Sequence, residues 1–183
     1  PKSGHEQLIL AMPAILRRVP EAKLVFVGGD SMSNKLSKCR ELLNQQAQKL
    51  IKELKLGNNV IFTGNIDYND LPELYESSDL VALCSKNEGF GLSVTEGMAC
   101  GNPIVGTRVG GIPLQVKEGE NGFLVDVGDI DATAEAIIKI LSDRALRNRM
   151  SLKSLEIVAA NFRMERGIEK HLTLYNKVIK YKD

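Results

Sequence analysis

Short runs of apolar, often β-branched residues alternate with longer amphipathic stretches from one end of the chain to the other. This alternation indicates repeated strand–helix units around a parallel sheet, whose strands are buried on both faces. The runs predict strands at residues 23–28, 59–64, 79–84, 103–107 and 122–126. We therefore expect an α/β fold with a Rossmann-like parallel sheet of about five or six strands and flanking helices.

Between these runs, apolar residues recur at helical spacing. They predict helices at residues 5–18, 37–55, 70–77, 92–100 and 112–118. After Asp126 the strand pattern stops, and three further helices are predicted at 129–141, 144–160 and 164–180. We expect these to pack as a C-terminal helical cap. Because no repeat or long linker interrupts the pattern, residues 1–183 are predicted to form a single domain.

Composition and charge exclude several classes of partner. With 183 residues, 43% of them hydrophobic, the chain is long enough for one sizeable core. The net charge is +1 and the basic residues are spread out, so we expect no nucleic acid partner. No apolar run approaches the roughly 20 residues of a transmembrane segment. Cys39, Cys84 and Cys100 lack CxxC spacing and resemble reduced thiols, which favours a cytoplasmic location.

The loops that follow the predicted strands are the places to look for chemistry, because open parallel sheets bind ligands beyond the carboxyl ends of their strands. The loop after the first strand begins with Gly28 and Gly29, whose missing side chains would let a phosphate or ribose approach the backbone. A plain strand-ending turn is an equally good interpretation of this glycine pair.

The loop before the predicted helix 92–100 is richer. The free N–H groups and the positive dipole end of that helix would suit a diphosphate, and Gly89 and Gly91 remove the Cβ atoms that would block it. Glu88 precedes the helix and could accept hydrogen bonds from sugar hydroxyls, while Glu96 lies about one turn inside, at a distance that suits a ribose diol. The alternative is that Glu96 only complements the helix dipole and that Glu88 is solvated. On the first reading, Gly91→Val weakens diphosphate binding and leaves stability intact.

At this point the sequence resembles the C-terminal, nucleotide-sugar-binding domain of the large retaining glycosyltransferase family with two Rossmann-like domains, the GT-B fold of the group 1 or family 4 type. Its signature is a pair of glutamates with seven residues between them, matched by Glu88 and Glu96, and it continues through Val105. Further ordered matches lie at residues 25–28, 60–64, 110–113 and 120–125. Several ordered matches are more specific than one motif.

The resemblance implies roles for individual residues. Glu88 would be the catalytic residue that contacts the transferred sugar, and Glu96 would meet the ribose of the nucleotide-diphosphate sugar. The base, which could be that of UDP, GDP or ADP, would lie near Asn65 and Ile66. No metal or other cofactor is expected, because backbone amides would face the phosphates. Those amides belong to Phe90, Gly91 and Leu92.

The chain departs from the family pattern near its start. Family members usually carry an Arg and a Lys on the first strand-to-helix loop, with the Lys directly before a Gly or Asn, and both neutralise the departing diphosphate. Here Ser3 precedes Gly4, with Lys2 as its neighbour and a possible phosphate contact, and the Arg would lie before Pro1. The helical pattern starts without an initiator methionine. We therefore expect a domain excised from a two-domain enzyme, lacking the N-terminal acceptor domain and the strand upstream, and poor at catalysis alone.

Other functions remain as alternatives. Ser3 and the missing acceptor domain are also compatible with a non-catalytic nucleotide-binding or regulatory module. A nicotinamide-dependent dehydrogenase is disfavoured because no GxGxxG follows a strand, and a phosphate-loop NTPase because GxxxxGK[ST] is missing. His5 and His171 lack neighbouring ligands at metal-binding spacing and are interpreted as surface residues.

Overall fold

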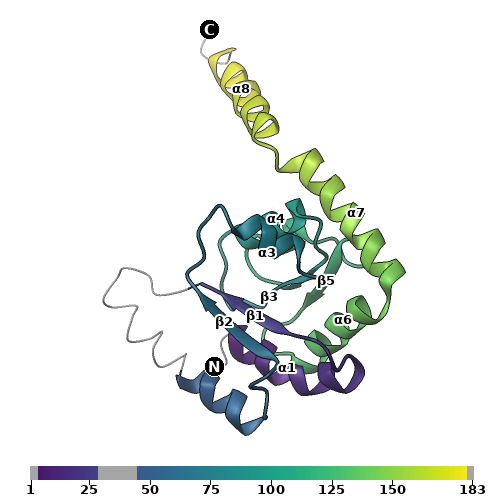
Figure 1. The fold of residues 1–183 in the computed structure, drawn as a ribbon. Helices are drawn as coiled ribbons and strands as arrows, with labels where there is room; N and C mark the ends of the chain where they lie inside the picture. Colours follow the sequence, from purple (N-terminus) through teal and green to yellow (C-terminus); the bar gives the residue numbers. More distant parts are fainter. Residues whose placement is uncertain (1–3, 29–44, 181–183) are drawn as a thin grey trace.

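The computed structural model describes residues 4–28 and 45–180 and confirms the α/β class (Figure 1). Every predicted strand is present: β1 Leu24–Val27, β2 Val60–Gly64, β3 Val81–Leu83, β4 Ile104–Thr107 and β5 Gly122–Val125. The named helices are α1 Gly4–Arg18, α3 Leu71–Glu76, α4 Leu92–Ala99, α5 Ile112–Gln115, α6 Ile130–Ser142, α7 Arg144–Asn161 and α8 Met164–Lys180. Residues 45–53 are also helical, which matches the described part of the predicted helix 37–55.

The strands form two parallel sheets instead of the single sheet that the pattern predicted. β1 pairs with β2 through Leu24 opposite Val60, and the second sheet has the order β3-β4-β5. In the described residues no hydrogen-bonded ladder joins β1 to β3. Ladder hydrogen bonds form only between neighbouring strands, and the described residues contain no strand that pairs with β1 on one side and with β3 on the other.

One hydrophobic core nevertheless connects both sheets. Phe26 of β1 and Val105 of β4 belong to the same cluster as Ile9 of α1 and Ile140 of α6. Both isoleucines are fully buried, and α1 packs along α6. The two sheets therefore share one covering layer of helices, although their strands do not pair.

A second core cluster lies between β3, β4 and the helices α4, α5 and α7. Its fully buried members include Val94 and Met98 of α4 together with Ile104 of β4. A Cβ atom at Gly97 would come within 2.7 Å of the Val81 side chain, so α4 approaches β3 closely. This contact fixes the direction of α4 and places its first turn beyond the end of β3.

The helices after β5 follow the prediction only in part. α6 and α7 pack against the body, with Met150 and Ile157 of α7 buried. α8 instead extends away from the body, as its yellow ribbon shows in Figure 1, and its described side chains are nearly all exposed. Ile168, Leu172 and Tyr175 are each more than half exposed. The apolar stripe of α8 has no partner in the described residues, so the cap consists of α6 and α7.

Two smaller findings concern cysteines and membranes. Cys84 is buried and Cys100 half-buried, and both are free thiols. Burial raises the pKa of Cys84 to about 12, although a hydrogen bond with Thr133 acts in the opposite direction. No described helix is long and apolar enough to cross a membrane.

Candidate functional site

The loop between β3 and α4 ends at Gly91, which is the N-cap of α4 with a left-handed φ of 83°. Val94 N–H donates to the Gly91 carbonyl at 2.9 Å and closes the first turn. The N–H groups of Phe90, Gly91 and Leu92 donate to no other group in the described residues. The positive end of α4 therefore carries unused donors, as the loop composition predicted.

The φ of Gly91 corrects one expectation about this glycine. Positive φ values are costly for residues with a Cβ atom. A Cβ at Gly91 would also lie 3.3 Å from the Leu83 side chain and 3.4 Å from that of Glu88. Gly91→Val would thus lower stability as well as any ligand affinity, contrary to the expected loss of affinity alone.

Glu88 is held at the start of the same loop. Ser85 Oγ donates to Glu88 Oε2 at 3.2 Å, and the Gly89 N–H donates to Oε1 at 3.1 Å. A carboxylate accepts about four hydrogen bonds, so these two leave capacity for further donors. Glu88 is half-buried and has a defined orientation before any ligand arrives.

Glu96 lies on the first turns of α4, also half-buried. The Tyr75 hydroxyl donates to Glu96 Oε2 at 3.0 Å. Burial first, and then the hydrogen bond to Glu96 and its charge, raises the pKa of Tyr75 well above its usual range. The phenol therefore stays protonated and acts as a donor. Sequence reasoning missed Tyr75, because nothing in residues 70–77 links it to a carboxylate 21 positions later.

The loop that contains Gly110 and Gly111 packs against the β3–α4 loop. Gly111 N–H donates to the Gly89 carbonyl at 2.8 Å, and a Cβ atom at Gly111 would lie 2.8 Å from Phe90 Cα. Gly110 has a φ of 52°, and a Cβ there would overlap the Glu88 carbonyl. The Gly110-Gly111 pair, recognised in the sequence only as part of a family match, is needed because two loops touch through their backbones.

The Gln115 side chain holds two backbone carbonyl groups of the β3–α4 loop. This fully buried residue of α5 donates through Nε2 to the Phe90 carbonyl, and Thr95 Oγ1 donates to its Oε1 at 2.6 Å. Its Nε2 also lies 3.4 Å from the Gly91 carbonyl. With their carbonyls held toward the interior, Phe90 and Gly91 keep their N–H groups available for other acceptors. No motif marked Gln115 as part of the site.

The remaining predicted residues lie at the ends of β1 and β2. Gly28 follows β1 with a φ of 123°, and its N–H donates to the Gly64 carbonyl at 3.0 Å. Ile66 is half-buried in the segment after β2. In the described residues, no hydrogen bond joins Gly28 or Ile66 to the loop that contains Glu88. Gly29, Lys2 and Ser3 lie outside the described residues.

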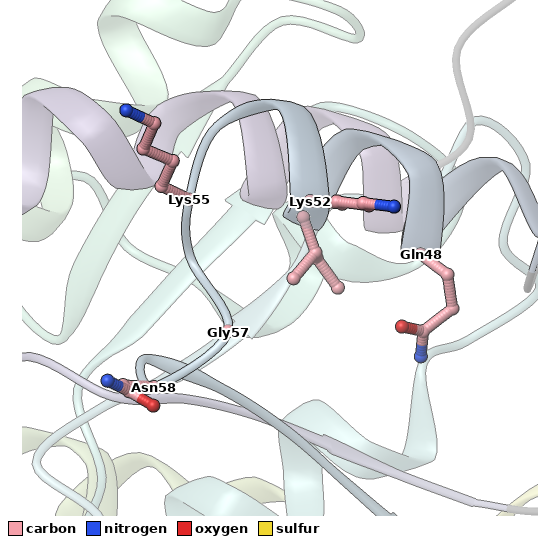
Figure 2. Close-up of a pocket in the computed structure, with 6 residues that line it drawn as sticks. Gln48, Lys52, Lys55, Gly57 and Asn58 are labelled. Atoms are coloured by element: carbon pink, nitrogen blue, oxygen red, sulfur yellow. The ribbon is translucent and has the colours of Figure 1, made fainter.

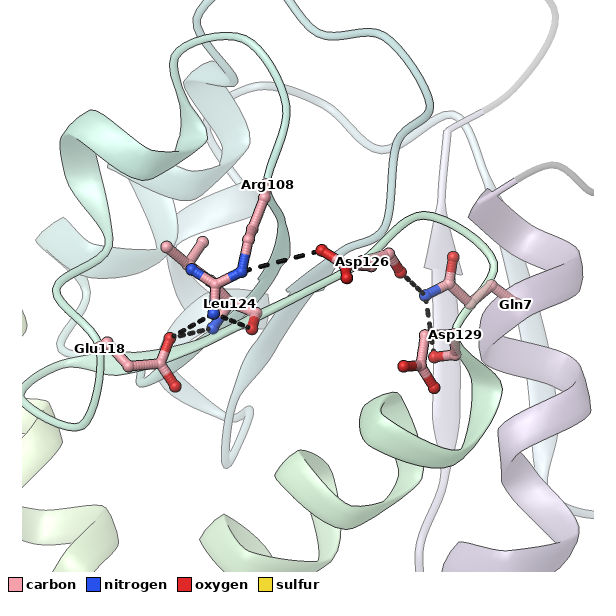
Figure 3. Close-up of polar contacts among 6 residues, drawn as sticks. All are labelled: Gln7, Arg108, Glu118, Leu124, Asp126 and Asp129. Carbon is pink, nitrogen blue, oxygen red and sulfur yellow. Dashed lines mark hydrogen bonds and ion pairs between the residues drawn. The ribbon is translucent and has the colours of Figure 1, made fainter.

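Basic groups near the ends of the strands are largely paired. Arg108 follows β4 and lies 3.5 Å from Glu118 and 3.8 Å from Asp126, while it donates to the Leu124 carbonyl at 3.1 Å (Figure 3). With two carboxylates beside it, Arg108 joins the ends of β4 and β5 and offers little net positive charge to an anion. Lys86 is the basic residue of the β3–α4 loop itself.

The start of α1 is held beside the β3–α4 loop. Gln7, buried in α1, accepts a hydrogen bond from Gly128 N–H at 2.8 Å and donates to Thr133 Oγ1 at 2.8 Å. Figure 3 shows the same amide facing the carbonyls of Asp126 and Asp129. Gly4 lies so close to the Cys84 carbonyl that a Cβ atom would overlap it. The amino end of α1 thus adjoins the end of β3.

A described cavity lies elsewhere, away from the β3–α4 loop. It has a volume of about 370 Å³ and precedes β2, so it is near the amino end of that strand and not its carboxyl end. Figure 2 shows Lys52 and Lys55 beside it, with Gly57 and Asn58 on the connecting turn. This open hollow contains none of the predicted site residues. The described residues also contain no group of three or more His, Cys, Asp or Glu that could hold a metal ion.

Comparison with known proteins identifies the family of the chain. The family described as "Glycosyl transferases group 1" matches residues 1–155. N-acetyl-alpha-D-glucosaminyl L-malate synthase of Bacillus anthracis is 39% identical over 132 residues, which are 72% of this chain and 34% of that protein.

Solved structures show the same similarity. The crystal structure of Anabaena Alr3699/HepE in complex with UDP is 28% identical, with a TM-score of 0.76 over 91% of this chain and 44% of that one. The C-terminal domain of a glycosyl transferase group 1 family protein, LpcC, from Francisella tularensis is 27% identical, with a TM-score of 0.78 over 88% of this chain and 80% of that domain. The fold is therefore that of the second Rossmann-like domain of GT-B proteins, and the chain belongs to the glycosyl transferases group 1 family.

Proposed function

We propose that this chain binds the nucleotide-sugar donor for glycosyl transfer with retention of configuration, to an acceptor held by another domain. The observation that carries this proposal is the unused N–H groups at the start of α4, next to the carboxylates of Glu88 and Glu96, each held by a hydrogen bond. Donors at a helix N-terminus suit a diphosphate, and carboxylates suit hydroxyl groups. The UDP named for the Anabaena structure is a ligand of this chemical class.

Each part of the donor would meet a different element. The diphosphate would accept hydrogen bonds from the amides of Phe90, Gly91 and Leu92, without a metal ion. Glu88 would contact the transferred sugar and so act in catalysis, while Glu96 would bind the ribose. Gly28, Gly29 and Ile66 would border the nucleoside, and Lys2 and Ser3 would adjoin the phosphates. Gln115 and Gly111 support this arrangement because they hold the loop in place without any ligand.

Transfer itself would need more than this chain. The chain spans 34% of the length of its Bacillus anthracis relative and 80% of the Francisella C-terminal domain. We therefore propose that it is one domain of a longer enzyme, with the acceptor domain elsewhere. Ser3 in place of a lysine removes a cation from the leaving-group side, so residues 1–183 alone are expected to bind the donor but transfer sugar poorly.

A second candidate is a nucleotide-binding module that performs no catalysis. Ser3 favours it, because a leaving diphosphate benefits from a positive charge whereas binding alone can rely on backbone amides. The candidates differ in what Ser3→Lys does to the longer protein. A catalytic domain should gain or retain transfer, whereas a binding module should show none in either form.

The binding proposal is tested by calorimetric titration with UDP, GDP and ADP and with one sugar conjugate of each. Glu96→Ala is expected to weaken binding of the free nucleoside diphosphate at least about tenfold, or about 1.4 kcal/mol, because every nucleotide carries the ribose. Glu88→Ala should weaken binding of the sugar conjugate but leave the affinity for the free nucleoside diphosphate nearly unchanged. Glu165→Ala on the exposed helix α8 is the control. Equal losses of both ligands on removing Glu88 would refute its assigned role.

A further inference from the structure

Tyr75 is the group that defines the orientation of Glu96. Its hydroxyl lies 3.0 Å from Glu96 Oε2, and no other described residue forms a hydrogen bond with the Glu96 carboxylate. Only Oε2 is therefore occupied. Glu96 Oε1 has no donor partner in the described residues and keeps its full capacity as an acceptor.

Tyr75 is itself fixed by a buried amide. Its backbone carbonyl accepts a hydrogen bond from Asn102 Nδ2 at 2.8 Å, and the Asn102 carbonyl accepts one from Ser154 Oγ at 2.7 Å. Asn102 and Ser154 are both buried. The helix α3 contains no buried residues of its own. The Asn102 side chain also lies 3.3 Å from the Gly97 carbonyl of α4, so it links Tyr75 to α4.

The surroundings of Glu96 include a thiol and a second carboxylate. Cys100 is close enough to both Glu76 and Glu96 for their charges, after burial, to raise its pKa. Both carboxylates therefore lie near this thiol at the end of α4. Without the Tyr75 donor, the Glu96 carboxylate would have no hydrogen-bond partner in the described residues.

We infer that Tyr75 is a positioning residue for the donor site: it holds one oxygen of Glu96 so that the other faces the vicinal hydroxyls of the ribose. This inference rests on the proposed function, because it takes Glu96 as the ribose ligand. It adds a residue from α3 to a site otherwise built from the β3–α4 loop and α4. A carboxylate fixed in advance loses less freedom on binding, which raises affinity.

The test is Tyr75→Phe, which removes the hydroxyl but keeps the ring. Calorimetry would compare UDP, GDP and ADP with their 2′,3′-dideoxy forms, which lack the hydroxyl pair. We expect the variant to bind the ribose diphosphate that the unaltered chain prefers about fivefold less tightly, because a hydrogen bond to a charged group is lost, and to bind its dideoxy form within about twofold of normal. Tyr68→Phe, at a residue 75% exposed, is the matched control.

Further outcomes separate this inference from the proposed function. In the Glu96→Ala background, adding Tyr75→Phe should cause no further loss, since Tyr75 acts only through Glu96. Equal losses for ribose and dideoxy ligands, or an undiminished affinity for the ribose form, would overturn the inference and leave the proposed function standing. If the unaltered chain bound none of these diphosphates, both would be overturned. Circular dichroism and a thermal melt of Tyr75→Phe would show whether any loss reflects unfolding instead.

Discussion

At the scale of single residues, the two glycines of the β3–α4 loop have different requirements. Gly91 has a φ of 83° and is buried, whereas a Cβ at Gly89 would meet nothing within 4 Å. Gly91→Ala is therefore expected to lower the free energy of unfolding by about 1–2 kcal/mol, the usual cost of a left-handed residue that carries a Cβ. Gly89→Ala should change it by less than about 0.5 kcal/mol.

Urea unfolding followed by circular dichroism measures both changes. The two variants add the same methyl group to the same loop, so their difference reports the backbone conformation of Gly91 together with the close contacts of its Cβ atom. If Gly91→Ala proved as stable as Gly89→Ala, Gly91 would not need its left-handed conformation. The role of this glycine would then have to be sought in ligand contact alone.

Residues of the candidate site were predictable where a local pattern marked them. Glu88, Gly91 and Glu96 stand close together in sequence around one helix start, and the structure places them in one loop and helix. Tyr75 and Gln115 could not be found this way, because each acts through a side chain about 20 positions away. Such contacts depend on how α3 and α5 pack against α4, which periodicity does not specify.

At the scale of helices and strands, α8 is separable from the body. It packs against α7, and residues such as Leu172 and Leu174 are 56% exposed. Ending the chain after Arg163 is therefore expected to leave the free energy of unfolding within about 0.5 kcal/mol of the intact value, because little buried area is lost. It should also reduce self-association, since exposed apolar stripes favour it.

The matched control is a chain that ends after Asp143. This change also removes α7, and with it the buried side chains of Met150 and Ile157, so it should unfold the domain or lower its stability severely. Thermal denaturation and analytical ultracentrifugation measure the two effects. A large loss of stability on removing α8 alone would show that it packs on the body in solution.

The same scale shows what periodicity can predict about helices. The amphipathic pattern of residues 164–180 gave the bounds of α8 correctly. It did not give its partner, because a helix with an apolar stripe looks the same in sequence whether that stripe is buried or exposed. All five strands were likewise found, but not their division into two sheets, since pairing is a property of neighbours and not of one segment.

At the scale of the whole molecule, β1 and β3 each have one edge that pairs with no other strand among the described residues. Leu24 N–H donates to Asn59 and Gly28 N–H to Gly64, so by the alternation of a parallel ladder the N–H groups of Val25 and Val27 point away from β2. The N–H of Ala82 points away from β4 for the same reason, because the Val81 N–H donates to the Pro103 carbonyl just before β4. A core shared by both sheets holds these edges in one layer.

These edges lead to a prediction about the proposed longer protein. The amino end of α1 adjoins Cys84 at the end of β3, and α1 leads into β1. A strand that precedes α1 would therefore end beside β3 and could pair with both β3 and β1 in a right-handed crossover. We expect the amides of Val25, Val27 and Ala82 to exchange with deuterium at least about tenfold faster than that of Phe26 in residues 1–183. They should become protected in a protein that carries the upstream strand.

Residue-resolved hydrogen exchange measures this difference in protection, with the α6 amide of Ile140 as an internal reference that stays protected in both proteins. Protection of Val25 and Val27 already in residues 1–183 would mean that the edge of β1 is paired without any added strand.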